Sequence, residues 1–338
     1  MNFFRFSWLL SAHLLFLTIS FLRAESQYPE SVVSVQIKST ADGAIQNALF
    51  YDPKVNHPAP LLVALHTWSS DWKNTHNVPL AKGSIEKGWA FIHPDFRGPN
   101  KSPEACGSDL AVSDVIDAVN WVKENIKVDP KRIYLAGVSG GGHMALQMAG
   151  RAPQIWAGVS SWVPITDCAA WHRECVKSGR RYFKDLEKSC GGKPGDNSTV
   201  DEQYIKRSPL TWLANASEVP LDINAGITDG HTGSVPISHS LKAFNLLAQP
   251  QDRIKEKEID YFTEKSKVPG SLLSANPDPS YGEKNQPLWR AKSNLIRITI
   301  LNGGHQMIPV SYTHLRAHET GRNIVCRHLL EKKKCGGG

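Results

Sequence analysis

The segment Gly137-Val138-Ser139-Gly140-Gly141 has the residue pattern of a nucleophilic serine held at a sharp turn. It fits the G-x-S-x-G nucleophile elbow, in which a strand turns directly into a helix and exposes the serine hydroxyl. The flanking glycines lack a Cβ, which lets neighbouring backbones approach the strained turn closely. The residues before the motif suit a buried strand, and those after it suit an apolar helix. We therefore predict that Ser139 is a nucleophile; the alternative is a structural Gly-Ser turn.

Two further residues supply the groups that a serine nucleophile needs. A serine hydroxyl is a weak nucleophile at neutral pH, so it requires a base that a carboxylate orients. Asp229 follows the predicted strand 220–227, and His305 follows the predicted strand 295–301. Because the carboxyl ends of parallel strands meet at one edge of a sheet, we expect Ser139, Asp229 and His305 to form a catalytic triad. His305 would carry the proton between the serine and the leaving group, and Asp229 would fix the imidazole tautomer.

Other carboxylates and imidazoles are weaker candidates for the triad. Asp222 lies inside a predicted strand and Asp260 in a polar segment, so both are less suitable acids than Asp229. The alternative for Asp229 itself is a turn residue that bonds its own backbone. His231 is a rival base, but it is too close in sequence to the predicted acid for the usual geometry. His143 lies on the predicted helix after the nucleophile, where we interpret it as a packing residue or a support for the catalytic side chains.

A serine hydrolase also needs two backbone N–H groups aimed at the negative charge that develops on the substrate oxygen. Gly140 supplies one, since the first N–H groups of a helix have no intrahelical partner. The loop after the predicted strand 61–65 should supply the other, from Thr67 or Trp68. We select Trp68 as the second member of the predicted oxyanion hole and interpret His66, in the same loop, as structural.

Apolar runs and turn signals predict a chain in which strands and helices alternate. We predict strands at 31–38, 44–51, 61–65, 89–92, 133–138, 155–163, 220–227, 288–291 and 295–301, and helices ending near 87, 126 and 150 and spanning 234–247. The helix before 126 has one apolar stripe, with Ser108 or Asp109 as its N-cap, and the last helix has Pro236 in its first turn. This alternation predicts an α/β fold with a doubly wound, mostly parallel sheet, right-handed crossovers and an N-terminal hairpin.

Two stretches interrupt this rhythm. Residues 164–218 combine aromatic and basic side chains, and we expect them to fold over the carboxyl edge of the sheet. They form a substrate-shaping lid or, alternatively, an exposed helical excursion whose charges are simply solvated. Residues 249–286 are polar, with charge runs and prolines, and form a second excursion. Because the chain has no internal repeat and nothing that resembles a second independent domain, we predict one catalytic domain at 28–308.

The two ends of the chain are expected to lie outside that domain. Residues 1–24 start with a basic residue, continue as an apolar run and end at a small residue, as a secretory signal peptide does. An uncleaved membrane anchor is the alternative. Residues 309–338 resemble the translation of a sequencing-library adapter, which places the end of the native sequence near Met307. We therefore expect a secreted or periplasmic protein with no membrane contact once the signal peptide is cleaved.

The formal net charge of +7 does not indicate a nucleic-acid partner. Arg5 and Arg23 belong to the predicted signal peptide, and residues 310–338 hold six Lys or Arg residues against two Glu. These two ends leave a charge of about +1 on the predicted domain, which provides no electrostatic footprint for DNA or RNA. The expected partner is a small-molecule ester or a short peptide, and the oligomeric state is left open.

Four cysteines of the predicted domain suit an exported protein: Cys106, Cys168, Cys175 and Cys190. They permit disulfides in three connectivities, and the sequence does not select one of them. Three of the four lie within 164–218, where a disulfide that staples the loop is a better interpretation than zinc, because the Cys and His spacing gives no convincing fourth ligand. We predict neither a metal site nor a cofactor.

Four segments occur in an order that resembles a known family: Gly137 to Gly141, Arg207-Ser208-Pro209, Asp229 with Val235-Pro236 downstream, and Gly304-His305. Over about 61–305, the chain resembles the catalytic domain of the prolyl oligopeptidase family of serine peptidases. The resemblance implies an α/β-hydrolase fold, no metal, and transfer of an acyl group to water. It also implies that Ser139, Asp229 and His305 are the catalytic triad.

Two features set the chain apart from that family. The chain is too short for the family's N-terminal β-propeller, which restricts those enzymes to short peptides, and the run from Asp229 to His305 is longer than usual. Single-domain relatives are often esterases. We therefore expect a secreted serine hydrolase that forms an acyl-Ser139 intermediate from an ester or a short peptide. The alternative is a non-catalytic α/β-hydrolase fold used as a binding module, against which the presence of all three triad residues argues.

Overall fold

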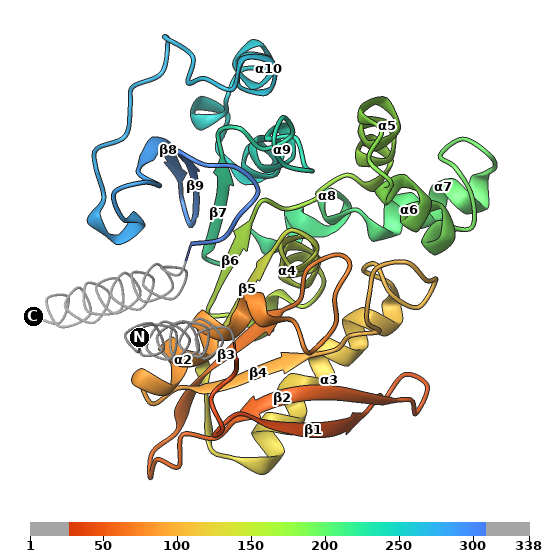
Figure 1. The fold of residues 1–338 in the computed structure, drawn as a ribbon, viewed down its shortest axis with the longest axis vertical. Helices are drawn as coiled ribbons and strands as arrows, with labels where there is room; N and C mark the ends of the chain where they lie inside the picture. The colour runs from red at the N-terminus through yellow and green to blue at the C-terminus, as the bar shows by residue number, and fades with distance from the viewer. Residues whose placement is uncertain (1–26, 309–338) are drawn as a thin grey trace, which may run out of the picture.

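The computed structural model of the protein describes residues 27–308 (Figure 1). The predicted signal peptide at 1–24 and the predicted non-native tail at 309–338 lie outside these residues and stay predictions. Within 27–308, none of the helices combines the length and the apolar character that crossing a bilayer requires.

Nine strands in the described residues form one sheet, in the order β1-β2-β4-β3-β5-β6-β7-β9-β8. The strands from β4 to β9 in this order pair in parallel, and β1, β2 and β8 are antiparallel additions at the edges. The strands are β1 Val33–Lys38, β2 Ile45–Tyr51, β3 Ala59–Leu65, β4 Ala90–Pro94, β5 Val128–Val138, β6 Gly158–Trp162, β7 Leu221–Gly226, β8 Pro287–Ser293 and β9 Ile296–Leu301. The predicted fold class, a mostly parallel sheet with an N-terminal hairpin, is confirmed.

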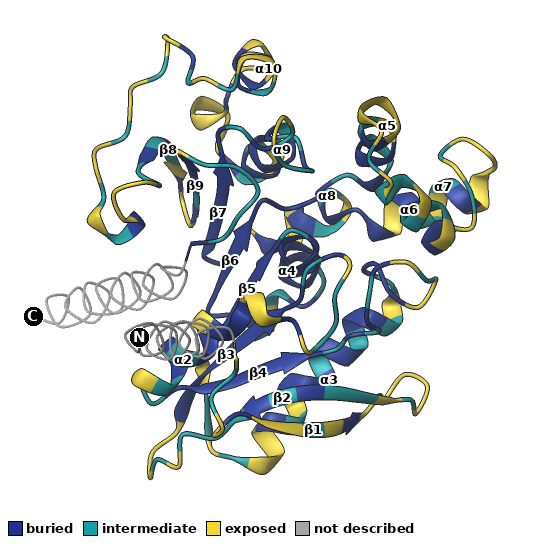
Figure 2. Cartoon of the chain, in the orientation of Figure 1, coloured by how far each residue is buried: buried dark blue, intermediate teal, exposed yellow. Residues whose placement is uncertain are grey.

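Both faces of the central strands are buried, as a continuous apolar run predicts for a parallel sheet. Alternate residues of β3 enter two different hydrophobic clusters, because successive side chains of a strand point to opposite faces. Leu61, Val63 and Leu65 pack with residues of the helices α3 (Asp109–Asn125) and α4 (Gly140–Arg151). Leu62 and Ala64 pack on the other side with residues of α2 (Val78–Glu86). Figure 2 shows β3 to β7 as the buried centre of the molecule.

The helices that cover the sheet are α2 Val78–Glu86, α3 Asp109–Asn125, α4 Gly140–Arg151 and α9 Ser238–Leu247. Short 3-10 turns add η1 Thr75–Asn77, η2 Pro153–Ile155, η3 Leu213–Ala216, η4 Pro250–Asp252 and η5 Pro279–Tyr281. Of the two predicted caps of α3, the structure uses Ser108, whose Oγ accepts the Ala111 N–H at 3.1 Å. Helix α4 is buried from Gly140 to Gly150, which places the predicted elbow at the centre of the molecule.

Three predicted boundaries are wrong, each for a local reason. Helix α9 begins at Ser238 rather than at 234, because the Val235 N–H donates to the Asp229 carboxylate and holds the preceding loop outside the helix. Strand β6 begins at Gly158 rather than at 155, since Pro153 opens a 3-10 turn first. Strand β5 begins before its Asp-Pro pair, at Val128, where it pairs with Ala59 across a bulge.

The two predicted excursions contain helices of their own. Residues 164–218 form α5 Cys168–Ser178, α6 Tyr182–Cys190, α7 Ser198–Arg207 and α8 Pro209–Trp212, and 249–286 include α10 Glu256–Lys265. The first excursion has a small hydrophobic cluster that also takes in Trp68 from the loop after β3. Helices α5 to α7 stand beside the carboxyl end of the sheet in Figure 1. The excursion is therefore attached to the sheet through the loop that the sequence assigns to the oxyanion hole.

The expected disulfides are absent from the described residues. Cys106, Cys168, Cys175 and Cys190 are all free thiols, and all are buried in the hydrophobic cluster of the first excursion. Burial disfavours the charged thiolate and raises the pKa of Cys175 to about 12. The cysteines therefore act in this structure as small apolar side chains.

Two buried histidines are held in the neutral form. His143 Nε2–H donates to the Arg207 carbonyl at 2.7 Å while Nδ1 has no partner, and burial lowers the pKa of His143 to about 4. His93 Nε2 accepts a hydrogen bond from Asn77, and its Nδ1–H donates to the Tyr28 hydroxyl at 2.9 Å. Burial lowers the pKa of His93 well below its usual value. An additional proton on either ring would be a buried charge without a carboxylate partner.

We predict that the free energy of unfolding falls when the pH is lowered from about 7.5 to about 5. The unfolded chain binds protons on these histidines near pH 6.5, whereas the folded chain resists them, so stability is full above that value and is lost below it. Asp95 acts in the opposite sense, because burial raises its pKa to about 6, but it is one group against three, since burial lowers the pKa of His66 as well.

His143→Gln should reduce this pH dependence by up to about 1.4 kcal/mol per pH unit below 6.5. The glutamine amide keeps a donor for the Arg207 carbonyl but binds no proton in this range. Urea unfolding of both proteins at the two pH values measures the effect. An identical pH dependence in wild type and variant would show that His143 is not the group involved.

Candidate active site

Ser139 lies at a strained turn between β5 and α4. Its backbone has a φ of 59° and a ψ of −116°, in a region that residues other than glycine rarely adopt. The Ser139 N–H donates to the Trp162 carbonyl at 2.8 Å, and its own carbonyl accepts the His143 N–H at 2.8 Å. A Cβ on Gly137 would lie 2.9 Å from the Gly141 Cα, so the strand and the helix could not pack this closely with a larger residue. The turn has the geometry predicted for a nucleophile elbow.

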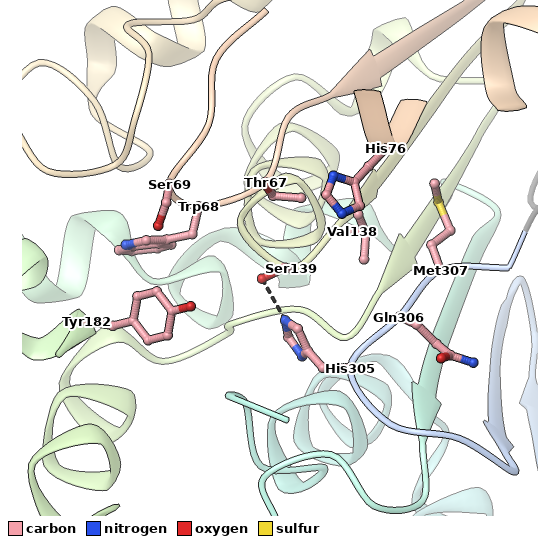
Figure 3. A pocket seen from close by; sticks show the side chains of 10 residues that line it. All are labelled: Thr67, Trp68, Ser69, His76, Val138, Ser139, Tyr182, His305, Gln306 and Met307. Atoms are coloured by element: carbon pink, nitrogen blue, oxygen red, sulfur yellow. Dashed lines mark hydrogen bonds between the residues drawn. The ribbon is translucent and has the colours of Figure 1, made fainter. Parts of the chain in front are cut away.

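The three predicted triad side chains meet in one chain of hydrogen bonds. His305 Nε2 lies 2.8 Å from Ser139 Oγ, and its Nδ1 lies 2.8 Å from Asp229 Oδ2 and 3.0 Å from Oδ1 (Figure 3 shows the Ser139–His305 bond). Asp229 is buried, and its Oδ1 also accepts the N–H groups of Gly230 and Val235 at 2.9 and 3.2 Å. Asp229 can therefore fix the ring so that Nδ1 carries the proton and Nε2 faces the serine as an acceptor.

Strand topology explains why residues so distant in sequence meet. Ser139, Asp229 and His305 follow β5, β7 and β9, which run in parallel with only β6 among them. Strand β3 lies next to β5, but the chain visits β4 on the other side of β3 before it returns to β5. The loops after β3 and β5 therefore flank a crevice at the carboxyl edge, which is where open α/β sheets bind ligands.

The predicted oxyanion hole also comes together. A Cβ on Gly140 would lie 2.5 Å from the Trp68 Cα, so the first residue of α4 abuts the loop after β3. The Trp68 N–H donates to no acceptor in residues 27–308, and the Gly140 N–H is at the free start of a helix. The two N–H groups proposed for the oxyanion hole therefore lie on backbones in close contact, and their role in binding a substrate oxygen stays a prediction. Thr67, the other sequence candidate, lies farther from Gly140, since the nearest atoms to a Cβ at Gly140 are the backbone N and Cα of Trp68.

His66 supports this loop from within the core. Its ring stacks on Phe96 with 3.8 Å between the centroids and 5° between the planes, and its Nε2 lies 2.6 Å from the Asp95 carbonyl. Its Nδ1 lies 3.0 Å from the Thr67 carbonyl. The ring is fully buried and does not line the crevice. His66 thus lies where the sequence interpretation places it, behind the site.

A pocket of about 350 Å³ opens over Ser139 and His305. Figure 3 shows that its remaining side chains form two groups on either side of the Ser139–His305 pair. Trp68, Ser69 and Tyr182 lie on the side of the helical excursion, and His76, Val138, Gln306 and Met307 lie on the opposite side, with Thr67 between them. A substrate carbonyl at Ser139 can therefore have one substituent on each side.

The sequence assigns no individual role to three residues of the site, although it groups two of them in the predicted lid at 164–218. Ser234 Oγ lies 3.2 Å from His305 Nε2, so it is a second hydroxyl on the catalytic ring. Arg180 donates to three carbonyl oxygens in the loop that carries Asp229, those of residues 230, 231 and 233. Tyr182 enters the pocket from α6. All three act through contacts between distant segments, which residue spacing does not encode.

The weaker candidates lie outside the triad. Asp222 forms a buried ion pair with Arg297 at 2.6 Å, and Asp260 lies exposed on α10. His231 Nε2 lies 2.7 Å from the Thr263 carbonyl. In the described residues, no group of three or more Cys, His, Asp or Glu side chains is arranged to hold a metal ion.

We predict that Gly233→Ala lowers kcat for an aryl ester by about 100-fold or more. The added Cβ would lie 2.5 Å from the His305 Cβ and would press on the Asp229 carboxylate, and a displacement of about 1 Å in catalytic groups costs this much. The matched control is Gly270→Ala, because a Cβ at Gly270 meets nothing within 4 Å. Steady-state kinetics and thermal melts of both variants make the test. A Gly233→Ala enzyme as active as Gly270→Ala would contradict the tight fit described for the triad.

Comparison with known proteins identifies the family. Residues 83–266, more than half of the chain, match the prolyl oligopeptidase family. The matched stretch includes Ser139 and Asp229 and ends before His305.

Two relatives are similar over most of the chain. The uncharacterized protein YfhR of Escherichia coli (strain K12) is 24% identical over 242 residues, which cover 70% of this chain and 77% of YfhR. Poly(3-hydroxyalkanoate) depolymerase C of Paucimonas lemoignei is 27% identical over 273 residues, which cover 75% of this chain and 58% of the depolymerase.

Solved structures share the fold at lower identity. The acylaminoacyl peptidase of Pyrococcus horikoshii has a TM-score of 0.52 and 17% identity, over 68% of this chain and 36% of the peptidase. Prolyl oligopeptidase B from Galerina marginata has a TM-score of 0.51 and 17% identity, over 64% of this chain and 31% of that enzyme. The chain thus spans about a third of the length of these peptidases. Together with the strand order, the family match shows that the chain belongs to the prolyl oligopeptidase family and has the α/β-hydrolase fold.

Proposed function

We propose that the protein is a serine hydrolase that cleaves ester or short peptide bonds through an acyl-Ser139 intermediate. The observation that carries this proposal is the continuous hydrogen-bonded chain from Ser139 Oγ through His305 to the buried Asp229. That arrangement is what a serine needs to act as a nucleophile at neutral pH. The membership of a hydrolase family supports the same conclusion.

In the first half of the reaction, Ser139 Oγ forms a bond to the substrate carbonyl carbon while its proton moves to His305 Nε2. The negative charge on the carbonyl oxygen is stabilised by the Trp68 and Gly140 N–H groups, and Asp229 stabilises the imidazolium. Collapse of the tetrahedral intermediate breaks the bond to the alcohol or amine. The leaving group takes the proton from His305 Nε2 and departs, which leaves the acyl group on Ser139.

The second half repeats these steps with water. His305 Nε2 removes a proton from a water molecule as its oxygen bonds to the acyl carbon. The ester bond to Ser139 then breaks, and His305 returns the proton to Ser139 Oγ. The products are a carboxylic acid and the alcohol or amine released earlier, so the enzyme is restored.

The site supports cleavage of both ester and peptide bonds. One relative is named for an ester polymer and one structural neighbour for an acylaminoacyl peptide substrate, so both bond types belong to the proposal. Nothing in the triad separates the two, since the same acyl-serine forms from either. The pocket of about 350 Å³ supports a small acyl or leaving group beside Ser139.

We predict that a fluorophosphonate probe labels the protein at Ser139 and that Ser139→Ala abolishes labelling. The triad makes this hydroxyl nucleophilic, and Ser139 joins the His305 contact to a place at the elbow beside the Gly140 N–H. Asp229→Asn should lower kcat by about 10⁴-fold, because the amide favours the wrong imidazole tautomer. Peptide mapping of the labelled protein and steady-state kinetics with an aryl acetate and a proline anilide provide the measurements.

Ser234→Ala is the matched control, since Ser234 Oγ also contacts His305 Nε2 but is not at the elbow. It should still be labelled, at Ser139. Label on Ser234, or a wild-type protein that takes no label and hydrolyses neither substrate, would refute the proposed function and favour a binding module.

A further inference from the structure

A second pocket lies beside the active-site pocket and shares two wall residues with it. We call it the basic groove, and its lining is Ser69, Arg180, Arg181, Tyr182, Lys184, Asp185 and Lys188. Its volume is about 470 Å³. Ser69 and Tyr182 line both pockets, on the side of Ser139 where Figure 3 places Trp68. A substituent of a substrate bound at Ser139 that extends past Tyr182 therefore enters the basic groove.

The basic groove is lined by more cations than carboxylates, and one of the cations, Lys184, has its Nζ over the Phe183 ring at 5.9 Å from the centroid. Asp185 is its single carboxylate, and its Oδ2 already accepts the Trp68 Nε1–H at 3.3 Å. The Arg180 guanidinium is engaged by backbone carbonyls. The other three cations, Arg181, Lys184 and Lys188, are exposed, and none of them forms an ion pair with a carboxylate in residues 27–308.

Nearby acidic residues do not neutralise these cations. Glu174 of α5 pairs with His239 at 2.9 Å, and Glu187 of α6 pairs with His172 at 2.9 Å. Both histidines are buried, so these two carboxylates are directed away from the basic groove and toward the interior of the excursion. The positive charge of the groove is therefore accessible to solvent and to an anionic ligand.

The spacing of the three cations that lack a carboxylate partner in residues 27–308 places them on one face of α6. Arg181 precedes the helix as its N-cap, and Lys184 and Lys188 follow at three and seven positions. Residues three and four apart on a helix are neighbours, and like charges at that spacing repel each other. A bound anion relieves this repulsion. The arrangement therefore costs stability in the free protein and favours an anionic ligand.

Aromatic contacts join the groove to the catalytic machinery. Tyr182 stacks on Trp171 with 5.3 Å between the ring centroids, and Trp171 packs edge-on against Trp68 at 4.7 Å. Trp68 contributes the proposed oxyanion donor. These packed rings therefore hold the first turn of α6, which carries the cations, beside the loop that contributes Trp68.

We propose that the basic groove binds a carboxylate on the substrate, so that the preferred substrates are anionic esters or amides. This inference rests on the proposed function and names its substrate class. A carboxylate matches the exposed guanidinium and ammonium donors of α6. The size of the groove also suits a single substituent that carries one carboxylate. A polyanion such as a nucleic acid is a poorer match, because the predicted domain has a net charge of only about +1.

The test compares substrates that differ only in the distal charge. On the acyl side the pair is 4-nitrophenyl hydrogen suberate and 4-nitrophenyl octanoate; on the leaving-group side it is 4-acetoxybenzoate and its methyl ester. The variant combines Arg181→Gln, Lys184→Gln and Lys188→Gln, which keeps the structural Arg180. The matched control combines Lys242→Gln, Lys257→Gln and Lys267→Gln, three exposed lysines on and after α9 and α10 that remove the same charge elsewhere.

We expect the groove variant to lower kcat/KM for the anionic member of at least one pair by about 10-fold or more, with a change of under about 2-fold for the neutral member. The side that responds identifies whether the groove holds the acyl or the leaving group. Added salt should reduce the wild-type preference. Unchanged anionic and neutral rates, or an equal loss in the control variant, would overturn the proposal.

A binding measurement keeps this test separate from the proposed function. Calorimetry with Ser139→Ala protein, with and without the groove substitutions, compares the affinity for the suberate and octanoate esters without turnover. Selective loss of suberate binding supports the groove even if no hydrolysis is seen. Ser139-dependent hydrolysis with no preference for the anion in either assay refutes the groove and leaves the proposed function intact.

Discussion

The site depends on the close approach of two loops at the carboxyl ends of β3 and β5. Ser139 is held at a φ of 59°, which turns the strand into α4 and brings Gly140 against the backbone of Trp68. No side chain fits at Gly140, since even a Cβ would lie 2.5 Å from the Trp68 Cα. This contact sets the separation between the serine hydroxyl and both oxyanion donors. Asp229 and His305 reach the same edge from β7 and β9 and are held there by their own hydrogen bonds.

The sequence was sufficient to predict those residues of the site that lie at the carboxyl ends of strands. Ser139 directly follows β5, and Asp229 and His305 lie in the loops that follow β7 and β9, strands that apolar runs mark in the sequence. Glycines and chain order then predict which of the three is the nucleophile, which the acid and which the base. Trp68 was selected over Thr67 without a decisive sequence feature, and the structure brings its backbone to Gly140. Helix and strand types were predictable for the same reason, because local pattern determines them.

What the sequence did not predict depends on contacts between distant segments. Helix α9 begins at Ser238 rather than at the predicted residue 234, because the Val235 N–H donates to the Asp229 carboxylate. Residue propensities cannot predict a hydrogen bond between two loop residues of this kind. Ser234 approaches His305 across 71 residues of chain, and Arg180 reaches the carbonyls beside Asp229 across about 50. The disulfide expectation is wrong for a similar reason, because spacing in the sequence does not show how the cysteines pack. They lie in one hydrophobic cluster of the described residues as buried free thiols.

The most direct test of the central claim is to trap the covalent intermediate. Rapid acid quenching of the enzyme with excess 4-nitrophenyl octanoate, followed by intact-mass and peptide analysis, reports which residue carries the acyl group. The account predicts a burst of about one equivalent of 4-nitrophenol and an octanoyl group on the peptide that contains Ser139. Steady turnover with no burst and no adduct in any variant, including Asp229→Asn, or an acyl group on another residue, would contradict it.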